Sequence, residues 1–382
     1  MGKIKILRIL HRPSISGPTH HAAILQDYFN NSDFESKLLV GSISSNEKSG
    51  EYILKAKKVD YKQIPFSRNF NFIYDLISIL ELIKVVITYK PDIIHTHASK
   101  PGFYGRIIGK MFGVRVLVHT FHGHVFHSYF PVLVSFFIVQ IEKVLLKYFT
   151  NKIITISDSQ HFEIGSYLGN TNKIVNISLG LELSKYLTIT SNSQCEFKAK
   201  YGFVSYKVVG IIGRLCEIKN HKYFIEIANY LSLKNPDLMF CIAGDGELMD
   251  ELIKYSSLYP SLCNRIKFVG WIENTIEFFA GIDWLFLTSK NEGTPVCLIE
   301  GISSGLQVYS TLVGGVADIF KKCETGYALP SIFQAKLLDT VLENVINGNN
   351  ERLAPQIRKN ALINYGTDKL TSSLEELYRN LL

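Results

Sequence analysis

Alternation of short apolar runs with amphipathic stretches is the feature that most constrains the fold of this 382-residue chain. In the first half, apolar runs predict strands at 4–10, 37–40, 92–95, 114–120 and 152–157. Helical patterns lie between them at 19–30, 70–89, 102–112 and 132–149. Strands separated by helices of this length form βαβ units, which assemble into parallel sheets. Ligands of such sheets bind at the carboxyl ends of the strands.

The same alternation begins again in the second half. Strands are predicted at 208–212, 239–243, 266–269, 284–287 and 308–311, and helices at 221–233, 247–257, 275–281, 295–304 and 333–346. A polar stretch at 184–194 separates the two halves. We therefore expect two doubly wound α/β domains, 1–187 and 188–366, with a cleft between them. A last helix at about 367–382 is expected to cross back to the first domain.

Charge is distributed unevenly between the two halves. Residues 1–187 contain 22 Lys and Arg against 13 Asp and Glu, whereas the remainder contains 19 against 21. A basic half that is also rich in aromatic and aliphatic residues favours an anionic surface or an anionic acceptor. Because the charges are scattered and the sequence has no nucleic-acid-binding motif, no nucleic acid partner is expected.

The cysteines and the apolar runs indicate a cytoplasmic protein. None of the cysteines is spaced as Cys-x-x-Cys, so the sequence predicts neither a zinc motif nor a disulfide framework, and a reducing compartment is expected. The charged start MGKIKILRIL predicts a strand rather than a signal peptide. No apolar run reaches the length of a transmembrane helix. The cysteines are at positions 195, 216, 241, 263, 297 and 323.

The stretch 288–315, TSKNEGTPVCLIEGISSGLQVYSTLVGG, follows a buried strand and predicts a ligand site. Pro295 is expected at the first position of a helix, where its missing N–H is harmless. Free N–H groups and the helix dipole at such an N-terminus bind anions. Glu292 precedes this helix and Glu300 lies inside it, and carboxylates suit sugar hydroxyls better than phosphates. The alternative is a capped helix with two incidental acids.

A second loop, GRLCEIKNH at 213–221, follows the strand 208–212. Arg214 and Lys219 can both point into the cleft, and a guanidinium with an ammonium suits a diphosphate. Asn220 is expected to cap the next helix. A surface loop with two ordinary basic residues is the alternative. The turns GDGE at 244–247 and FVGW at 268–271 are weaker signals of the same kind.

In this order, GRLCEIKNH, IAGDGEL, VGW and NEGTPVCLIEGISSG followed by LVGG resemble the retaining glycosyltransferases of family 4, which have the GT-B fold. In the first half, PDIIHTHASKPG and HTFHGHVFHSYF resemble the subgroup that assembles bacterial surface polysaccharides such as capsule, O-antigen and exopolysaccharide. Three positions depart from the family pattern: Pro18 replaces a second glycine, Gly301 replaces an alanine and Gln307 replaces a proline.

The resemblance implies that the second domain binds a nucleotide-diphosphate sugar, UDP-linked, such as UDP-GlcNAc, UDP-GalNAc or a related hexose. The first domain would bind a lipid-linked saccharide or glycan acceptor. By matching position, Arg214 and Lys219 would hold the diphosphate, Glu292 the donor sugar and Glu300 the ribose, and His122 would contact the sugar at the reaction centre. The other donor-binding residues implied are Gly17, Gly213, Gly244, Gly246, Val269, Gly293, Thr294, Pro295, Val296 and Cys297.

The expected mechanism needs no metal or other cofactor. Two cations and a helix N-terminus can stabilise the departing diphosphate. The resemblance implies a front-face attack that retains the anomeric configuration. The alternative of a mechanism with a transient covalent bond to an enzyme nucleophile stays open. Two alternative functions also stay open: a UDP-sugar 2-epimerase of the same architecture, and a non-catalytic module that binds a nucleotide sugar.

His97, Lys100 and His124 are expected to line the acceptor site. Clustered histidines, including His95, His97, His119, His122, His124 and His127, also permit metal binding as a less favoured alternative. Lys100 and Arg106 are candidates for a lipid diphosphate. The basic, aromatic segment 129–149 could dock on the inner face of the cytoplasmic membrane. A buried core helix is the preferred interpretation for most of its residues.

Overall fold

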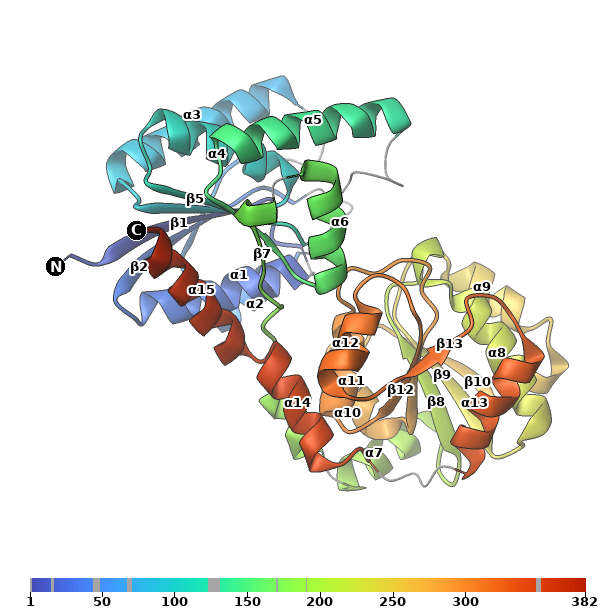
Figure 1. Cartoon of the computed structure of the whole chain (residues 1–382). Helices are drawn as coiled ribbons and strands as arrows, with labels where there is room; N and C mark the ends of the chain where they lie inside the picture. Colours follow the sequence, from blue (N-terminus) through green and yellow to red (C-terminus); the bar gives the residue numbers. More distant parts are fainter. Residues whose placement is uncertain are drawn as a thin grey trace. The chain divides into compact units, whose positions relative to one another are not determined.

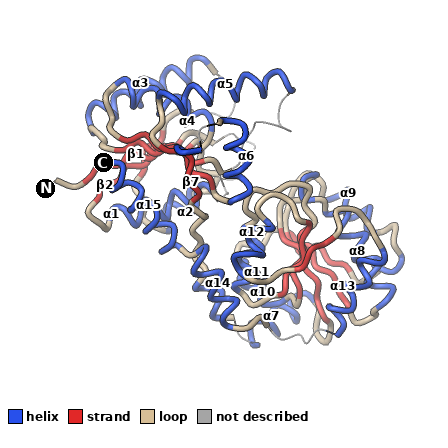
Figure 2. Tube along the Cα trace, in the orientation of Figure 1, coloured by secondary structure: helices blue, strands red, loops and turns tan. Residues whose placement is uncertain are grey.

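The computed structural model describes residues 2–14, 17–43, 49–66, 71–122, 131–169, 171–189, 191–347 and 352–382. The chain divides into two compact units, residues 1–181 with 367–382, and residues 182–366. Each unit is one parallel β-sheet covered by helices (Figures 1 and 2). The predicted fold class, two α/β units with parallel sheets, is confirmed.

The first unit contains a seven-stranded sheet in the order β3-β2-β1-β4-β5-β6-β7, and every adjacent pair is parallel. The strand order reverses between β1 and β4, and ligands of open α/β sheets bind at the carboxyl ends beside this switch point. The strands are β1 (Ile4–Leu10), β2 (Phe34–Val40), β3 (Tyr61–Gln63), β4 (Ile93–His97), β5 (Val116–Thr120), β6 (Lys152–Thr155) and β7 (Ile174–Asn176).

Helices cover both faces of this sheet (Figure 1). Alternate residues of β1 pack on opposite faces of the sheet, because successive side chains of a strand point in opposite directions. Ile6 packs with residues of α1 and α15, and Leu7 packs with residues of α3 and α4. The helices are α1 (Gly17–Asn30), α2 (Glu51–Ala56), α3 (Phe72–Tyr89), α4 (Ser99–Met111), α5 (Val132–Tyr148), α6 (Asp158–Leu168), the 3-10 turn η1 (Thr171–Lys173) and α15 (Thr367–Leu381).

The second unit contains a six-stranded parallel sheet in the order β10-β9-β8-β11-β12-β13, with its switch point between β8 and β11. Its strands are β8 (Lys207–Ile212), β9 (Leu238–Ala243), β10 (Ile266–Gly270), β11 (Trp284–Leu287), β12 (Gln307–Thr311) and β13 (Tyr327–Leu329). Its helices are η2 (Ser184–Thr188), α7 (Ser191–Tyr201), η3 (Glu217–Lys219), α8 (His221–Lys234), α9 (Met249–Ser256), η4 (Pro260–Leu262), α10 (Thr275–Gly281), α11 (Val296–Ser303), α12 (Val316–Cys323), α13 (Ala335–Asn347) and α14 (Pro355–Tyr365).

The stretch 184–194 is not a linker, and the two units divide shortly before the expected boundary at 187–188. Tyr186 of η2 is buried against Phe279, and its hydroxyl donates to Glu300, both in the second unit. Because this anchor holds η2, the units divide between Leu181 and Glu182. The sequence patterns also missed β3, β7 and β13, which have three residues each, and the helices α2, α6, α7, α12 and α14.

Helix α5 lies on the surface of the first unit, which contradicts the preference for a buried core helix. Val139, Leu145 and Leu146 of α5 are buried and Ile138 is partly buried, but most of its large apolar side chains are exposed: Val132, Leu133, Val134, Phe136, Phe137, Ile141, Val144 and Tyr148. Among the described residues, no helix is long and apolar enough to cross a membrane.

Candidate active site

Two loops meet at the switch point of the second unit. Residues 213–220 follow β8, and residues 288–295 follow β11, the strand next to it. The Thr288 hydroxyl donates to the Asn220 carbonyl at 3.0 Å, and the Lys290 N–H donates to the Ile218 carbonyl at 2.8 Å. The structure therefore joins the two segments that the sequence singled out separately.

An ion pair connects these loops. The Lys219 ammonium lies 2.6 Å from Oε1 of Glu292, and the Ser289 hydroxyl donates to the same oxygen at 2.6 Å. The Lys219 side chain is 24% exposed and the Glu292 side chain 9%. Burial disfavours the ammonium charge, but the neighbouring Glu292 carboxylate outweighs this effect and raises the pKa of Lys219. The sequence assigned these two residues to different parts of the donor and did not predict their contact.

The turn after β9 packs against the loop that carries Arg214. Gly244 has φ +142°, and a Cβ at this position would lie 1.9 Å from the Gly213 carbonyl oxygen. A Cβ at Gly246 would lie 2.4 Å from the carbonyl oxygen of Leu215. Both glycines therefore permit a close backbone contact. Gly213, Gly244 and Gly246 are brought together, and the side chain of Arg214 beside them is exposed.

The predicted residue Val269 lies next to this turn. It occupies an irregularity of β10, where the pairing register with β9 shifts between Phe268 and Gly270. The Gly270 carbonyl accepts a hydrogen bond from the Gly244 N–H at 2.8 Å. The backbone around Val269 is therefore tied to the glycine turn.

Helix α11 begins one residue later than predicted. Pro295 has φ −71° and ψ 104°, so it is the extended residue that precedes the helix, and Val296 is the first helical residue. Proline fixes only φ, and its ψ here is not helical. The N–H groups of Val296 and Cys297 belong to the first turn, where helix N–H groups lack intrahelical acceptors. Burial raises the pKa of the Cys297 thiol to about 12, so it is neutral at pH 7.

The glycine pair that follows β12 supports the loop before α11. Gly314 has φ +53°, and a Cβ there would lie 1.6 Å from the Glu292 carbonyl oxygen. The Gly315 N–H donates to the Gly293 carbonyl at 2.8 Å. This contact positions Glu292, Gly293 and Thr294 ahead of the helix.

Glu300 is hydrogen-bonded to Tyr186, a residue that the sequence did not predict for the site. Its Oε1 accepts a hydrogen bond from the Tyr186 hydroxyl at 2.6 Å, and this hydroxyl also lies 2.7 Å from Oγ1 of Thr275. Burial raises the pKa of Glu300, whereas the hydrogen bond from Tyr186 opposes that rise. Tyr186 lies in a polar stretch without periodicity, so no sequence signal indicated it.

Asn220 does not cap α8 as predicted. It precedes the helix in a left-handed conformation, φ 52°, and its side chain makes no capping hydrogen bond. This conformation turns its side chain away from the geometry of a capping asparagine, which is extended. The next residue, His221, is buried, and burial together with the charge of Lys219 lowers its pKa to about 4.

In the first unit, His97 and His122 come together beside the β1–β4 switch point. His97 ends β4, His122 follows β5, and Nδ1 of His97 lies 3.0 Å from Nε2 of His122. His21 of α1 packs edge-on against both rings, with centroid distances of 5.5 and 5.0 Å. His21 was not predicted, because it lies in α1, far in the sequence from the histidines that follow the strands β4 and β5. His124 lies outside the described residues.

The basic residues proposed for a lipid diphosphate have protein partners. Arg106 is fully buried and donates to Glu142 at 2.8 Å and to the Gly102 carbonyl at 2.6 Å. The assignment of Arg106 to a ligand is therefore wrong, because its charge is neutralised inside the unit. Lys100 lies 2.6 Å from Asp75 and remains a predicted acceptor residue. Gly17 is the first residue of α1, and its donor role stays a prediction.

Two protein-family models match this chain, one in each unit. The family model described as Glycosyltransferase Family 4 matches residues 15–185, and the model described as Glycosyl transferases group 1 matches residues 193–362. The chain is 27% identical over 321 residues to the UDP-Gal:alpha-D-GlcNAc-diphosphoundecaprenol alpha-1,3-galactosyltransferase of Escherichia coli, with 82% of each chain covered. It is 22% identical over 326 residues to the capsular polysaccharide biosynthesis glycosyltransferase CapM of Staphylococcus aureus, with 84% of each covered.

Among solved structures, HepE of Anabaena in complex with UDP superposes with a TM-score of 0.82 at 17% identity. The match covers 99% of this chain and 100% of HepE. This similarity shows the fold, and the two family models cover most of both units. The chain therefore belongs to glycosyltransferase family 4 and has the GT-B fold, with the group 1 region in its second unit.

Proposed function

We propose that this glycosyltransferase moves a hexose from a UDP-sugar to a lipid-linked saccharide or glycan acceptor during assembly of a surface polysaccharide. One observation supports the proposed binding of the UDP-sugar donor: the loops after β8 and β11 meet. The Lys219–Glu292 pair, the exposed Arg214 and the N-terminus of α11 occur together there. Donor and acceptor classes are argued by similarity: the E. coli relative uses UDP-Gal and a diphosphoundecaprenol-linked sugar by its name.

In the proposed reaction, the bond between the sugar C1 and the diphosphate oxygen breaks, and that oxygen keeps the electron pair. Arg214, Lys219 and the N–H groups at the start of α11 stabilise the negative charge that develops there. An acceptor hydroxyl attacks C1 from the same face, so the configuration is retained, and its proton passes to the departing diphosphate oxygen. The protein thus supplies the cationic charge at the diphosphate, and we propose that this step needs no metal.

Glu292 and Glu300 are assigned to hydroxyl recognition rather than to acid–base chemistry. Glu292 is held by Lys219 and Ser289 through one oxygen, Oε1, so its orientation is set before a sugar arrives. Glu300 is oriented in the same way by Tyr186. A carboxylate that is already oriented loses little conformational entropy when it accepts a hydrogen bond from a ligand.

A donor and acceptor screen tests the proposal. Purified protein is incubated in EDTA with UDP-GlcNAc, UDP-GalNAc, UDP-Gal or UDP-Glc and a synthetic polyprenyl-diphosphate-linked sugar; UDP release and the anomeric configuration of the product are measured. We expect UDP release with one of these donors, dependence on acceptor, and an axial product linkage from an axial donor. Conversion of the donor to its 2-epimer without acceptor would show an epimerase instead, and donor binding without turnover would show a binding module.

We also propose that the first unit docks on anionic lipid at the inner face of the cytoplasmic membrane. Helices α3 and α5 lie on the same side of the sheet as α4 (Figure 1), and the side chains of Phe72 and Val132 are 71% and 87% exposed. Large exposed apolar patches mark interaction surfaces. The further exposed apolar residues of α3 are Ile73, Tyr74, Leu76, Ile77, Leu80 and Ile87.

Charge on these helices selects an anionic surface. Lys84, Lys110, Lys143 and Lys147 are exposed on α3, α4 and α5. The acidic residues of the same helices are paired within the unit: Asp75 with Lys100, Glu81 with Lys62 and Glu142 with Arg106. Apolar side chains between basic ones are typical of proteins that bind anionic bilayers.

Vesicle sedimentation tests this contact. We expect the protein to sediment with phosphatidylglycerol vesicles and to stay in solution with pure phosphatidylcholine. Phe137→Asp should weaken binding by about 10-fold or more, because burying one phenylalanine contributes about 1.5–3 kcal/mol. Leu258→Asp, at a residue of the second unit that is 67% exposed, is the control and should bind like wild type. Equal binding by Phe137→Asp and wild type would exclude α5 as the docking surface.

A further inference from the structure

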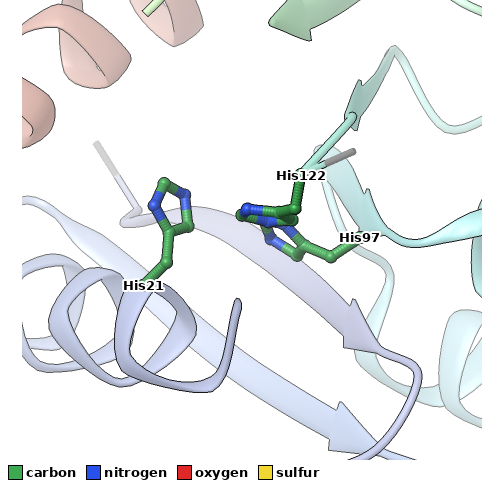
Figure 3. Close-up of side chains that lie close together, drawn as sticks. All are labelled: His21, His97 and His122. Atoms are coloured by element: carbon green, nitrogen blue, oxygen red, sulfur yellow. The ribbon is translucent and has the colours of Figure 1, made fainter. Parts of the chain in front are cut away.

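The first unit carries three histidines, His21, His97 and His122, whose side chains point toward one another (Figure 3). One ring nitrogen of each lies within 4.8 Å of the others. The residues come from three elements beside the β1–β4 switch point: His21 from α1, His97 from the end of β4 and His122 from the segment after β5. The roles that the resemblance implies for His97 and His122 do not explain why His21 should join them.

Buried nitrogens of this cluster lack hydrogen-bond partners. Both ring nitrogens of His21, and Nε2 of His97, are inaccessible to solvent and have no partner within the described part of the chain. A buried polar group without a partner destabilises the folded chain. Nδ1 of His97 and Nε2 of His122 face each other at 3.0 Å, so only one of them can carry a proton in that gap. The cluster therefore has several lone pairs available to a ligand.

The three imidazoles are neutral at physiological pH. Burial lowers the pKa of His21 and His97 well below the usual value and lowers that of His122 to about 4. Neutral imidazole is the form that coordinates metal ions, because its second nitrogen keeps a lone pair.

We propose that His21, His97 and His122 together bind one transition-metal ion of the Zn²⁺ class, each through one ring nitrogen. Three nitrogen ligands suit Zn²⁺, Co²⁺ and Ni²⁺, whereas Mg²⁺ and Ca²⁺ prefer oxygen ligands. Zn–N bonds of about 2.0–2.1 Å place tetrahedral ligand nitrogens about 3.3 Å apart. The His97–His122 separation of 3.0 Å is close to this value, and His21 needs a small side-chain movement.

Three protein ligands leave a coordination position open. Sites of this kind bind a water or another oxygen ligand in the fourth position, whereas closed structural zinc sites have four protein ligands. The buried guanidinium of Arg8 acts electrostatically on His21 and His97 and opposes a cation. We therefore expect weaker, reversible binding rather than a permanently occupied structural site.

Metal titration of the whole protein tests the proposal without any sugar substrate. The protein is treated with EDTA, transferred to metal-free buffer and titrated with Zn²⁺ by calorimetry, and with Co²⁺ while its visible absorption is recorded. We expect one site for each ion, a cobalt spectrum with nitrogen ligands in a tetrahedral field, and no binding of Mg²⁺. Zn²⁺ should also raise the melting temperature, because a ligand that binds only the native state stabilises it.

Histidine variants locate the ion. His21→Asn should weaken Zn²⁺ binding by more than the roughly 10- to 100-fold that loss of a second-shell partner costs. His20→Asn, at the exposed neighbouring histidine outside the cluster, is the matched control and should bind like wild type. His122→Asn, at a partly exposed position, provides a second test if His21→Asn does not fold. The absence of a one-to-one site in wild type would overturn the proposal, and so would unchanged binding by both cluster variants.

Discussion

The contact between Lys219 and Glu292 places two charges in a partly buried position. Removing two charges from water is costly, and the pair offsets this cost only because its geometry is close and Ser289 adds a hydrogen bond. Each partner therefore depends on the other. A change at either residue affects the charge at the proposed diphosphate site and the orientation of the loop that precedes α11.

Lys219→Ala should lower kcat/KM for transfer by about 10²–10³, the range seen when one preorganised donor to a developing negative charge is removed. Steady-state UDP release measures this effect. Lys290→Ala, which removes an exposed ion pair with Glu217 in the same loop region, is the control and should stay within about twofold of wild type, because exposed pairs contribute little. Wild-type activity in Lys219→Ala would exclude a role for this ammonium in transfer.

Tyr186→Phe should weaken donor binding while it keeps the ring contact with Phe279. The variant removes a hydrogen bond that lowers the pKa of Glu300, so this pKa should rise further and less of the carboxylate should be ionised. A hydrogen bond to a charged group contributes about 1.5–3 kcal/mol, so the donor KM should rise by about 10- to 100-fold, with little change in kcat.

The pH profile of KM distinguishes this effect from general damage. The increase in KM should be largest at low pH, where Glu300 is protonated in more molecules. Tyr206→Phe, at an exposed tyrosine, serves as the control. A fall in kcat with unchanged KM would contradict the assignment of Glu300 to donor binding.

At the scale of elements, the turns that follow the strands give the second unit its site. β8, β9 and β11 end at neighbouring positions, and the turn 244–247 fits against the Arg214 loop only because two glycines allow backbone contact. The loop after β12 fits against Glu292 in the same way through Gly314. Close contacts between backbone segments therefore set the positions of the loops that carry the side chains of the candidate site.

Gly244→Ala should destabilise the second unit more than Gly270→Ala. Both glycines have positive φ, but a Cβ at Gly244 would lie 1.9 Å from the Gly213 carbonyl oxygen, whereas a Cβ at Gly270 meets nothing within 4 Å. Gly270→Ala should cost about 1–2 kcal/mol, from the left-handed conformation alone. Urea denaturation and calorimetric binding of UDP measure the two effects. Equal stability and equal UDP affinity in the two variants would show that the turn can shift without consequence.

Element prediction worked where an element is long or continuously buried. The strands 208–212 and 284–287 agree with β8 and β11 to within one residue, because buried parallel strands have near-continuous apolar runs. Three-residue strands such as β13 contain too few positions to show a period. The surface position of α5 was not predictable, because a helix that is apolar on several sides has the same pattern in a core.

At the scale of the whole molecule, the two units place their candidate sites at equivalent points of similar sheets. In the first unit this is the β1–β4 switch point with its histidines, and in the second it is the β8–β11 switch point with Lys219 and Glu292. The C-terminal helix α15 completes the first unit. The Tyr378 hydroxyl of this helix is hydrogen-bonded to Nδ1 of His95 at 2.5 Å. Residues nearly 300 positions apart thus form one polar interior.

Stability should fall as the pH is lowered, because the first unit buries neutral histidines. Burial lowers the pKa of His122 from the usual value of about 6.5 to about 4, so the unfolded state binds protons first as the pH falls. The contribution is complete above pH 6.5 and is lost as pH falls toward 4. Each such histidine changes the free energy of unfolding by at most about 1.4 kcal/mol per pH unit.

Thermal unfolding between pH 7 and pH 5 measures this dependence. His122→Asn, which cannot titrate, should show a shallower decrease than wild type, and His161→Asn, at a partly exposed histidine of α6, should match wild type. Identical slopes for wild type and His122→Asn would show that this imidazole is already accessible to protons in the folded chain.

The sequence by itself determined the α/β class, the order of the main elements and the two segments, 213–221 and 288–315, that meet at the candidate site, because periodicity and turn chemistry are local properties. Only the tertiary structure decided which side chains meet. It joined Lys219 to Glu292, placed Tyr186 on Glu300, neutralised Arg106 with Glu142 and brought His21 to His97 and His122. These contacts join residues far apart in the chain, and parallel strands bring them together only after the sheet order is set.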